Sequence, residues 1–312
     1  MTVARREHFG KLLEPGLRKI FYEEFNQLPS MIPELYNVQS TSNPWEEDVS
    51  IGTLGEFPEF RGTVEYDRMY EGYSTVYSFP EFAKGFQIER KLFDDQRYAI
   101  IKKQPKGLAM SAFRRRESDA AYIFNNAFTH VGSDGVPLVS DAHPSPAPDG
   151  PPARSNIVSW KLGHDALRAT HLMGRAFVDD RGGKIETNFD TLIVPPDLEE
   201  IGWSIITADG RLEATHPGTH PNIHKGKYKL VVWDYLTNPD VWFLADSRMM
   251  KMYLNWFDRV PLEFAMTEDF DTMVAKYRAY MRYGFGFSDW IWVIGSTGEE
   301  EYSLPQTSEG NG

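Results

Sequence analysis

The 312-residue sequence contains no cysteine. Disulfide bonds, thiolate metal sites and a cysteine nucleophile are therefore excluded, and the composition suits a reducing cytosol. The sequence also lacks any run of about 18 apolar residues, so no segment is expected to span a membrane. The N-terminus, from Met1 to Gly10, is polar and has no signal-peptide core. We expect a protein that is made and used in a cytoplasm.

Basic residues are in the minority. Lys and Arg total 33 against 45 Asp and Glu, which gives a formal net charge of −12. The short basic cluster Arg114-Arg115-Arg116 lies inside a helical pattern and is followed by Glu117. A protein that grips nucleic acid usually carries a basic patch or tail. Strong direct binding of DNA is therefore not expected, whereas an acidic wall that encloses DNA without holding it fits this charge.

Motifs for nucleophilic or nucleotide chemistry are missing as well: there is no G-x-S-x-G elbow, P-loop or G-x-G-x-x-G fingerprint. The pair Asp94-Asp95 opens a helical pattern, where carboxylates cap free backbone N–H groups. Asp179-Asp180 is interpreted as part of a turn, and His143, which precedes a proline, as a turn residue. We expect no catalytic residue, no metal and no cofactor.

A histidine cluster offers the one alternative with chemistry. His216, His220 and His224 are spaced by four residues, which on a helix would place three imidazoles on one face. Pro217 and Pro221 lie between them and disfavour a helix. We interpret the segment as a solvent loop and keep a metal-dependent enzyme as the alternative.

Aromatic residues make up 14% of the chain. In residues 1–60, proline and glycine interrupt regular structure after a short amphipathic helix predicted over Leu17–Phe25. Apolar residues nevertheless recur: Ile32, Leu35, Tyr36, Trp45, Ile51, Phe57 and Phe60. A disordered tail would lack such anchors. We therefore predict an extended arm laid along another surface.

Residues 63–79 have the clearest local pattern, that of a β-hairpin. With Glu71-Gly72 at a two-residue turn, the strand alternation gathers apolar side chains on one face. That face holds Val64, Tyr66, Tyr70, Tyr73, Tyr77 and Phe79. An isolated two-stranded hairpin is marginal in water, so the face needs a cover. We predict that it contacts a neighbouring subunit, together with Trp45 and Phe57 of the arm, although packing on its own domain stays open.

The remaining chain mixes helices and strands without regular βαβ alternation, which indicates the α+β class. Helices are predicted over 94–128, with a break at 105–107, over 159–173, and after Pro196. Strands are predicted over 191–194, over 230–235 and 241–244 as a hairpin, over 273–283, and over 290–294. Gly284-Phe285-Gly286 is expected to break the penultimate strand. The stretch from Thr297 is expected to be loose.

Several short segments occur in a specific order. Leu138-Val-Ser-Asp-Ala-His-Pro144 is followed by Asn156-Ile157, the helix near Leu162–Met173 and Asp180-Arg-Gly-Gly183. Next come Leu192-Ile-Val-Pro-Pro196, Leu230-Val-Val-Trp233 and Trp242-Phe-Leu-Ala-Asp246. In order and spacing they resemble the major head subunit family of Mu-like phages, as do Asn125–Phe128 and Tyr283–Phe287. The resemblance covers roughly residues 60–296.

This resemblance implies the tailed-phage major capsid fold, of the Hong Kong 97 type. Carried over, residues 1–60 are the N-terminal arm, 61–90 the E-loop hairpin, and 91–186 the peripheral domain, with a spine helix at about 94–128. Residues 187–268 are the axial domain, 269–298 the return strand of the peripheral domain, and 299–312 a flexible tail. In such capsids the arm and the E-loop lie across neighbouring subunits.

The implied function is a major capsid protein that self-assembles into the hexamers and pentamers of an icosahedral head around double-stranded DNA. It would be assembled in the host cytoplasm and reside in the virion, without enzymatic activity. The arm begins almost at Met1, so we expect a separate scaffolding protein, besides a portal and possible decoration proteins. An encapsulin-like compartment of the same fold, holding protein cargo, is the closest alternative.

Overall fold

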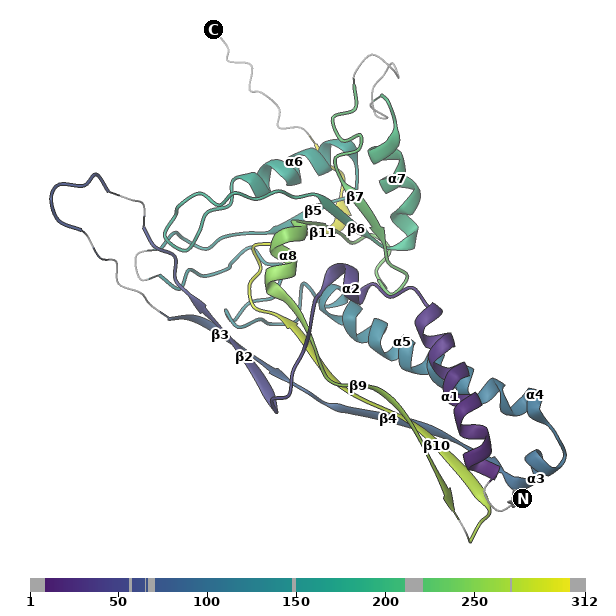
Figure 1. Cartoon of the computed structure of the whole chain (residues 1–312). Helices are drawn as coiled ribbons and strands as arrows, with labels where there is room; N and C mark the ends of the chain where they lie inside the picture. The colour runs from purple at the N-terminus through teal and green to yellow at the C-terminus, as the bar shows by residue number, and fades with distance from the viewer. Residues whose placement is uncertain are drawn as a thin grey trace.

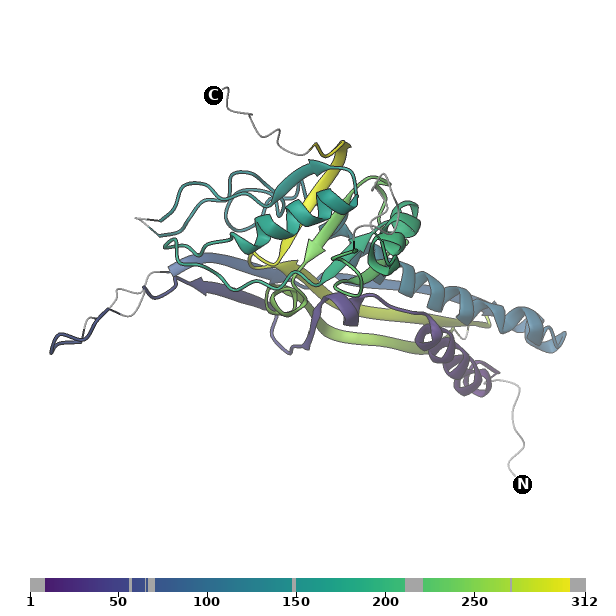
Figure 2. The ribbon, with the colours of Figure 1, turned by 90° about the horizontal axis from the view of Figure 1, so that it is seen from above.

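The computed structural model describes residues 9–55, 58–64, 66, 71–147, 150–210, 221–269 and 271–303. Its elements form a long, slender sheet with two helices and a smaller five-stranded domain (Figure 1). Seen from above, the five-stranded domain lies on one side of the long sheet (Figure 2). No helix of the described residues is long and apolar enough to cross a membrane.

The long sheet has the strand order β1-β9-β10-β4. Its centre is the antiparallel pair β9 (Leu254–Asp269) and β10 (Val274–Phe287), flanked by β4 (Glu81–Glu89) and by the short parallel strand β1 (Asn37–Ser40). Side chains of β10 alternate between buried and partly exposed, as the sequence predicted for residues 273–283. The alternation places Ala275, Tyr277 and Ala279 in the core under the helices.

The expected break at Gly284-Phe285-Gly286 is wrong, because β10 continues to Phe287. A Cβ on Gly284 would collide with the backbone oxygen of Ser78, and a Cβ on Gly286 would lie 2.9 Å from the Tyr77 ring. The two glycines therefore let the strand preceding β4 approach the backbone closely.

The long helix is α5 (Lys103–Asn125), preceded by the short helices α3 (Arg90–Asp94) and α4 (Tyr98–Ile101). The sequence predicted one helix broken at 105–107, but the break lies earlier, where Gln96 has a φ of +55°. Pro105 falls in the first turn of α5, where its missing N–H costs no intrahelical bond. The expectation that Asp94-Asp95 opens a helix is also wrong, since the pair closes α3.

The N-terminal segment is more regular, and more tightly packed on its own subunit, than expected. Helix α1 (Phe9–Gln27) contains the predicted helix and buries Leu17 and Phe21 against the long sheet. The next helix is α2 (Ile32–Leu35), and Tyr36 after it donates a hydrogen bond to the carbonyl of Ala120, at 2.6 Å. The anchors Ile32, Leu35 and Tyr36 are buried in the subunit's own core. The expectation that they lie on another surface is therefore wrong.

The five-stranded sheet has the order β5-β11-β8-β6-β7. Its strands are β5 (Ile157–Trp160), β6 (Thr191–Val194), β7 (Lys229–Val232), β8 (Trp242–Ala245) and β11 (Val293–Glu300). The predicted hairpin of 230–235 with 241–244 is wrong, because β6 lies between β7 and β8 and pairs with both. The end of the chain was expected to be loose from Thr297, but β11 extends to Glu300.

Helices cover this sheet. They are α6 (His164–Arg175) and the one-turn 3-10 helix η2 (Pro196–Leu198) continued by α7 (Glu199–Thr207), whereas α8 (Ser247–Tyr253) packs on β1 and β9 of the long sheet. The helix predicted over 159–173 is split, because its first residues belong to β5. Phe124 of α5 joins the two parts of the molecule, since its ring makes edge contacts with Trp233, Phe243 and Trp292 of the five-stranded domain.

Hydrogen bonding divides the chain differently from the predicted domain ranges. Residues 254–269 were assigned to the axial domain, yet β9 pairs with β10 in the long sheet. Residues 157–175 and 293–298 were assigned to the peripheral domain, yet β5 and β11 belong to the five-stranded sheet. The pairing of strands distant in sequence, which local patterns do not contain, sets these boundaries.

Candidate functional site

Two antiparallel strands leave the body of the molecule as a ribbon, β2 (Trp45–Ile51) and β3 (Glu71–Ser78). The ribbon and residues 58–64 beyond it project past the rest of the chain (Figure 1). The sequence predicted that residues 63–70 pair with β3 around a turn at Glu71-Gly72. This is wrong, because Glu71 and Gly72 lie within β3, whose partner is β2.

One face of the ribbon, here called the outer face, exposes most of its apolar side chains. Along β2 it carries Trp45, Val49 and Ile51, which are 52%, 43% and 61% exposed, together with Glu47. Val76 of β3, opposite Glu47, is 62% exposed. Apolar side chains this exposed on a regular strand face mark a contact surface.

The other face of the ribbon packs on the subunit itself. Tyr77 and Phe79 are only 2% and 5% exposed and contact the ring of Phe257 on β9. Burial raises the pKa of Tyr77 to about 12, and its hydroxyl lies 3.4 Å from the side-chain amide of Asn255. Tyr77 and Phe79 are thus unavailable to a neighbour, so their assignment to an intersubunit face is wrong. Tyr73, on the same face as Tyr77, is partly buried.

The chain between β2 and β3 carries further exposed apolar residues. The described ones are Leu54, Phe60, Val64 and Tyr66, with exposures from 58% to 89%. Of the predicted contact residues, Trp45, Val64 and Tyr66 are therefore exposed, while Phe57 and Tyr70 lie outside the described residues. The outer-face residues Val49 and Val76 were missed, because the wrong strand was taken as the partner of β3.

The outer end of the ribbon, where the loop between β2 and β3 begins, is fixed to the body through Thr53. Its backbone N–H donates to Asp180 Oδ2 at 3.1 Å, and its hydroxyl donates to the same carboxylate. Asp180 is 7% exposed, and Asp179 shapes the turn that holds it by accepting from the N–H groups of Arg181 and Gly183. The turn predicted for the Asp179-Asp180 pair is confirmed. These bonds hold the first residues of the loop between β2 and β3 against the body.

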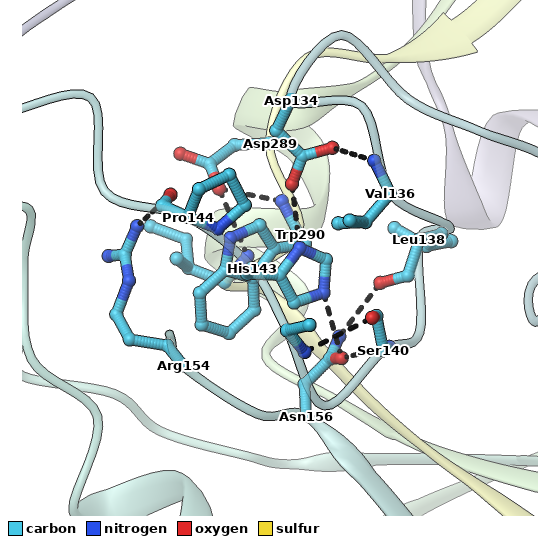
Figure 3. A network of polar contacts seen from close by, with 12 residues as sticks. Asp134, Val136, Leu138, Ser140, His143, Pro144, Arg154, Asn156, Asp289 and Trp290 are labelled. Carbon is cyan, nitrogen blue, oxygen red and sulfur yellow. Dashed lines mark hydrogen bonds and ion pairs between the residues drawn. The ribbon is translucent and has the colours of Figure 1, made fainter. Parts of the chain in front are cut away.

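A buried polar network supports the same region from inside. His143, expected to be a turn residue, has no exposed surface, and its ring stacks on Trp290 at 4.2 Å (Figure 3). Its Nδ1 lies 2.7 Å from Asp134 Oδ2 and its Nε2 lies 3.0 Å from Asn156 Oδ1. The amide of Asn156 donates to two backbone carbonyls, so its oxygen must face His143. Both ring nitrogens thus lie within hydrogen-bond distance of side-chain oxygens, one from the carboxylate of Asp134 and one from the amide of Asn156.

Sequence reasoning missed this network. A signal was present, because an aspartate, a histidine and an asparagine lie within the 23 residues from Asp134 to Asn156. His143 and Asn156 are fully buried and Asp134 is 10% exposed, so the network holds the loops together from inside.

The histidine loop shows no metal site in the part that is described. His216 and His220 lie outside the described residues, while His224 is 1% exposed and its Nε2 lies 3.0 Å from the His164 carbonyl. Among the described residues, no group of three or more histidine, aspartate or glutamate side chains is placed to bind a metal ion.

The ribbon, the long sheet with its helix and the five-stranded domain can now be compared with known proteins. A family model described as phage capsid protein matches residues 72–295, well over half of the chain. The chain belongs to the phage capsid protein family. The match includes nearly all of β3 and both sheets except β1 and the end of β11. Comparison with curated protein sequences gives no match.

Solved structures of capsids are similar to this phage capsid chain in fold. A chain from the capsid of bacteriophage JBD30, decorated with minor capsid protein trimers, has a TM-score of 0.55 at 10% identity, covering 67% of this chain and 92% of that one. A chain from the mature capsid of bacteriophage PhiM1 has a TM-score of 0.54 at 13% identity, covering 89% of each. A virus-like particle from Pyrococcus furiosus gives 0.52 at 10% identity, covering 90% and 98%. The fold is that of tailed-phage capsids, and the α+β class is confirmed.

Proposed function

We propose that this phage capsid protein is the major head subunit and that it self-assembles into the hexamers and pentamers of an icosahedral shell around double-stranded DNA. The observation that carries the proposal is the outer face of the ribbon. Its apolar side chains project from the body, and only another molecule can bury them. Burial contributes roughly 25 cal/mol per Å2 of apolar area, and many such contacts act together in a closed shell.

The ribbon and its loop correspond in this proposal to the E-loop, and the five-stranded domain to the axial domain. The mechanism is packing without catalysis. The net charge of −12 favours an interior that encloses DNA without binding it tightly. A separate scaffolding protein, a portal and decoration proteins are the proposed partners, and the Mu-like head subunits are the proposed subfamily. Assembly would occur in the host cytoplasm.

Electron microscopy of the purified, overexpressed chain tests the proposal, because shells, tubes or free capsomers are directly visible. Icosahedral particles, or ordered hexamers, are the expected result, whereas a chain that stays monomeric at high concentration would contradict it.

The content of particles purified from infected cells tests the role. Nuclease-protected DNA is expected for a phage head, and a protein cargo without DNA would favour an encapsulin-like compartment instead.

A further inference from the structure

One helix of the five-stranded domain exposes an acidic and aromatic face. Glu199 and Glu200 of α7 lie one turn before Trp203, so the three side chains share the side of the helix that faces away from the sheet. Trp203 is 61% exposed. The two carboxylates complement the helix dipole, but that role does not account for an exposed tryptophan.

Another helix of the same domain exposes a basic and aliphatic face. Arg168, Leu172 and Arg175 of α6 are spaced by four and three residues and are all exposed, Leu172 by 53%. Lys227 adds a third positive charge. Burial, and then the charge of Arg175, lowers the pKa of Lys227, which places the two cations near each other.

The two faces are complementary in charge and each has an apolar centre. None of the charges on either face forms an ion pair with another described residue. The helices lie at different sides of the domain, α6 across one side of the sheet and α7 beyond β7 (Figure 1). One copy can therefore present α7 while the next presents α6.

We propose that the α7 face, centred on Trp203, docks on the α6 face, centred on Leu172, of a second copy of this chain. The contact joins two different surfaces, so repetition around an axis closes a ring, as a hexamer or pentamer requires. Trp203 is the aromatic anchor of the contact. The acidic pair of α7 attracts the basic α6 face of the neighbour and repels the acidic α7 face of another copy. This inference rests on the proposed function and names the surfaces that the subunits use around the capsomer axis.

Charge exchange tests the contact. Variant A carries Glu199→Lys and Glu200→Lys, variant B carries Arg168→Glu and Arg175→Glu, and variant C carries all four changes. Because like charges would meet at every contact, A and B are each expected to reduce the particle yield at least about tenfold. Variant C restores opposite charges and is expected to regain most of the wild-type yield. Yields are measured by sedimentation and negative-stain microscopy.

Controls separate the possible failures. Asp234→Lys, on the exposed turn before β8, is expected to assemble normally. Trp203→Ser should remove particles while leaving the thermal unfolding of the subunit unchanged, since the side chain is exposed; particles at wild-type yield would overturn its role as anchor. Assembly of A or B at wild-type yield, or failure of C to recover although it folds, overturns the inference. Absence of particles from the wild-type chain itself would instead overturn the proposed function.

Discussion

Acidification is expected to destabilise the five-stranded domain through two buried histidines. His171 of α6 and His224 of the loop before β7 are 9% and 1% exposed. The pKa of each is lowered from 6.5 to about 4. Burial is the main cause, and the neighbouring Lys227 for His171 and His164 for His224 contribute next.

The sign and size of the effect follow from these values. Above pH 6.5 both histidines are neutral in the folded and in the unfolded chain, so they add no pH dependence. Below that pH the unfolded chain binds protons that the folded chain excludes, and the free energy of unfolding falls until the pH reaches about 4. With roughly 1.4 kcal/mol per pKa unit, each histidine accounts for a loss of about 2 kcal/mol at about pH 5.

The assay is urea unfolding of the unassembled chain at about pH 7 and about pH 5, for the wild type and for His224→Gln. The glutamine amide keeps a donor for the His164 carbonyl, 3.0 Å from the imidazole, but does not titrate. The variant is expected to lose about 2 kcal/mol less than the wild type on acidification. Comparing the two proteins cancels the pH dependence that other groups contribute equally to both, such as Asp289, whose pKa is raised by burial. Equal losses in the two proteins would refute a neutral, buried His224.

Three further changes probe other parts of the structure. Gly107 lies on α5 with open space around it, so Gly107→Ala is expected to stabilise the chain by about 0.5–1 kcal/mol. At Gly174 a Cβ would overlap the Phe189 ring, so Gly174→Ala should cost about 1–3 kcal/mol. Equal melting temperatures of the two variants would contradict both expectations. His143→Ala removes a fully buried ring that stacks on Trp290 and bonds Asp134, and should cost about 3 kcal/mol in chemical unfolding. A loss below about 1 kcal/mol would argue against a structural role of the network. Thr53→Val removes the hydroxyl bond to Asp180 and is expected to speed hydrogen exchange at the outer end of the ribbon, near Ile51 and Glu71, while global stability stays within about 1 kcal/mol. Unchanged exchange would show that this bond does not fix the start of the loop.

Local periodicity was sufficient to predict much of the secondary structure. The alternation over residues 273–283 predicted β10. Pro196 was predicted in the first turn of a helix, and it begins the helical turn before α7. Both signals depend on residues close together in the chain, where the period of the side chains or a fixed φ decides the outcome. The ordered segments over residues 60–296 predicted the capsid fold for a different reason, namely their shared order with a known family.

Strand pairing could not be predicted in the same way. The tyrosines of residues 66–77 suggested a hairpin closed at Glu71-Gly72, but β3 pairs with β2, more than 20 residues earlier. The same limit affected β7 and β8. They follow each other in the sequence and were predicted to pair, but β6 lies between them in the sheet. Hydrogen bonds between strands depend on which backbone is nearest in space, and the sequence pattern of one strand fits several partners.

The sequence by itself determined the absence of cysteine, the acidic charge, the mixed class and the exposed character of Trp45, Val64 and Tyr66. Only the tertiary structure decided that Tyr77 and Phe79 close the subunit's own core, and that His143 is a buried partner of Asp134. It also placed Trp203 and Leu172 at the centres of oppositely charged helix faces. The physical reason is that an apolar or ionisable side chain is equally suited to a core and to an interface. Its surroundings, set by contacts distant in the sequence, decide which of the two it joins.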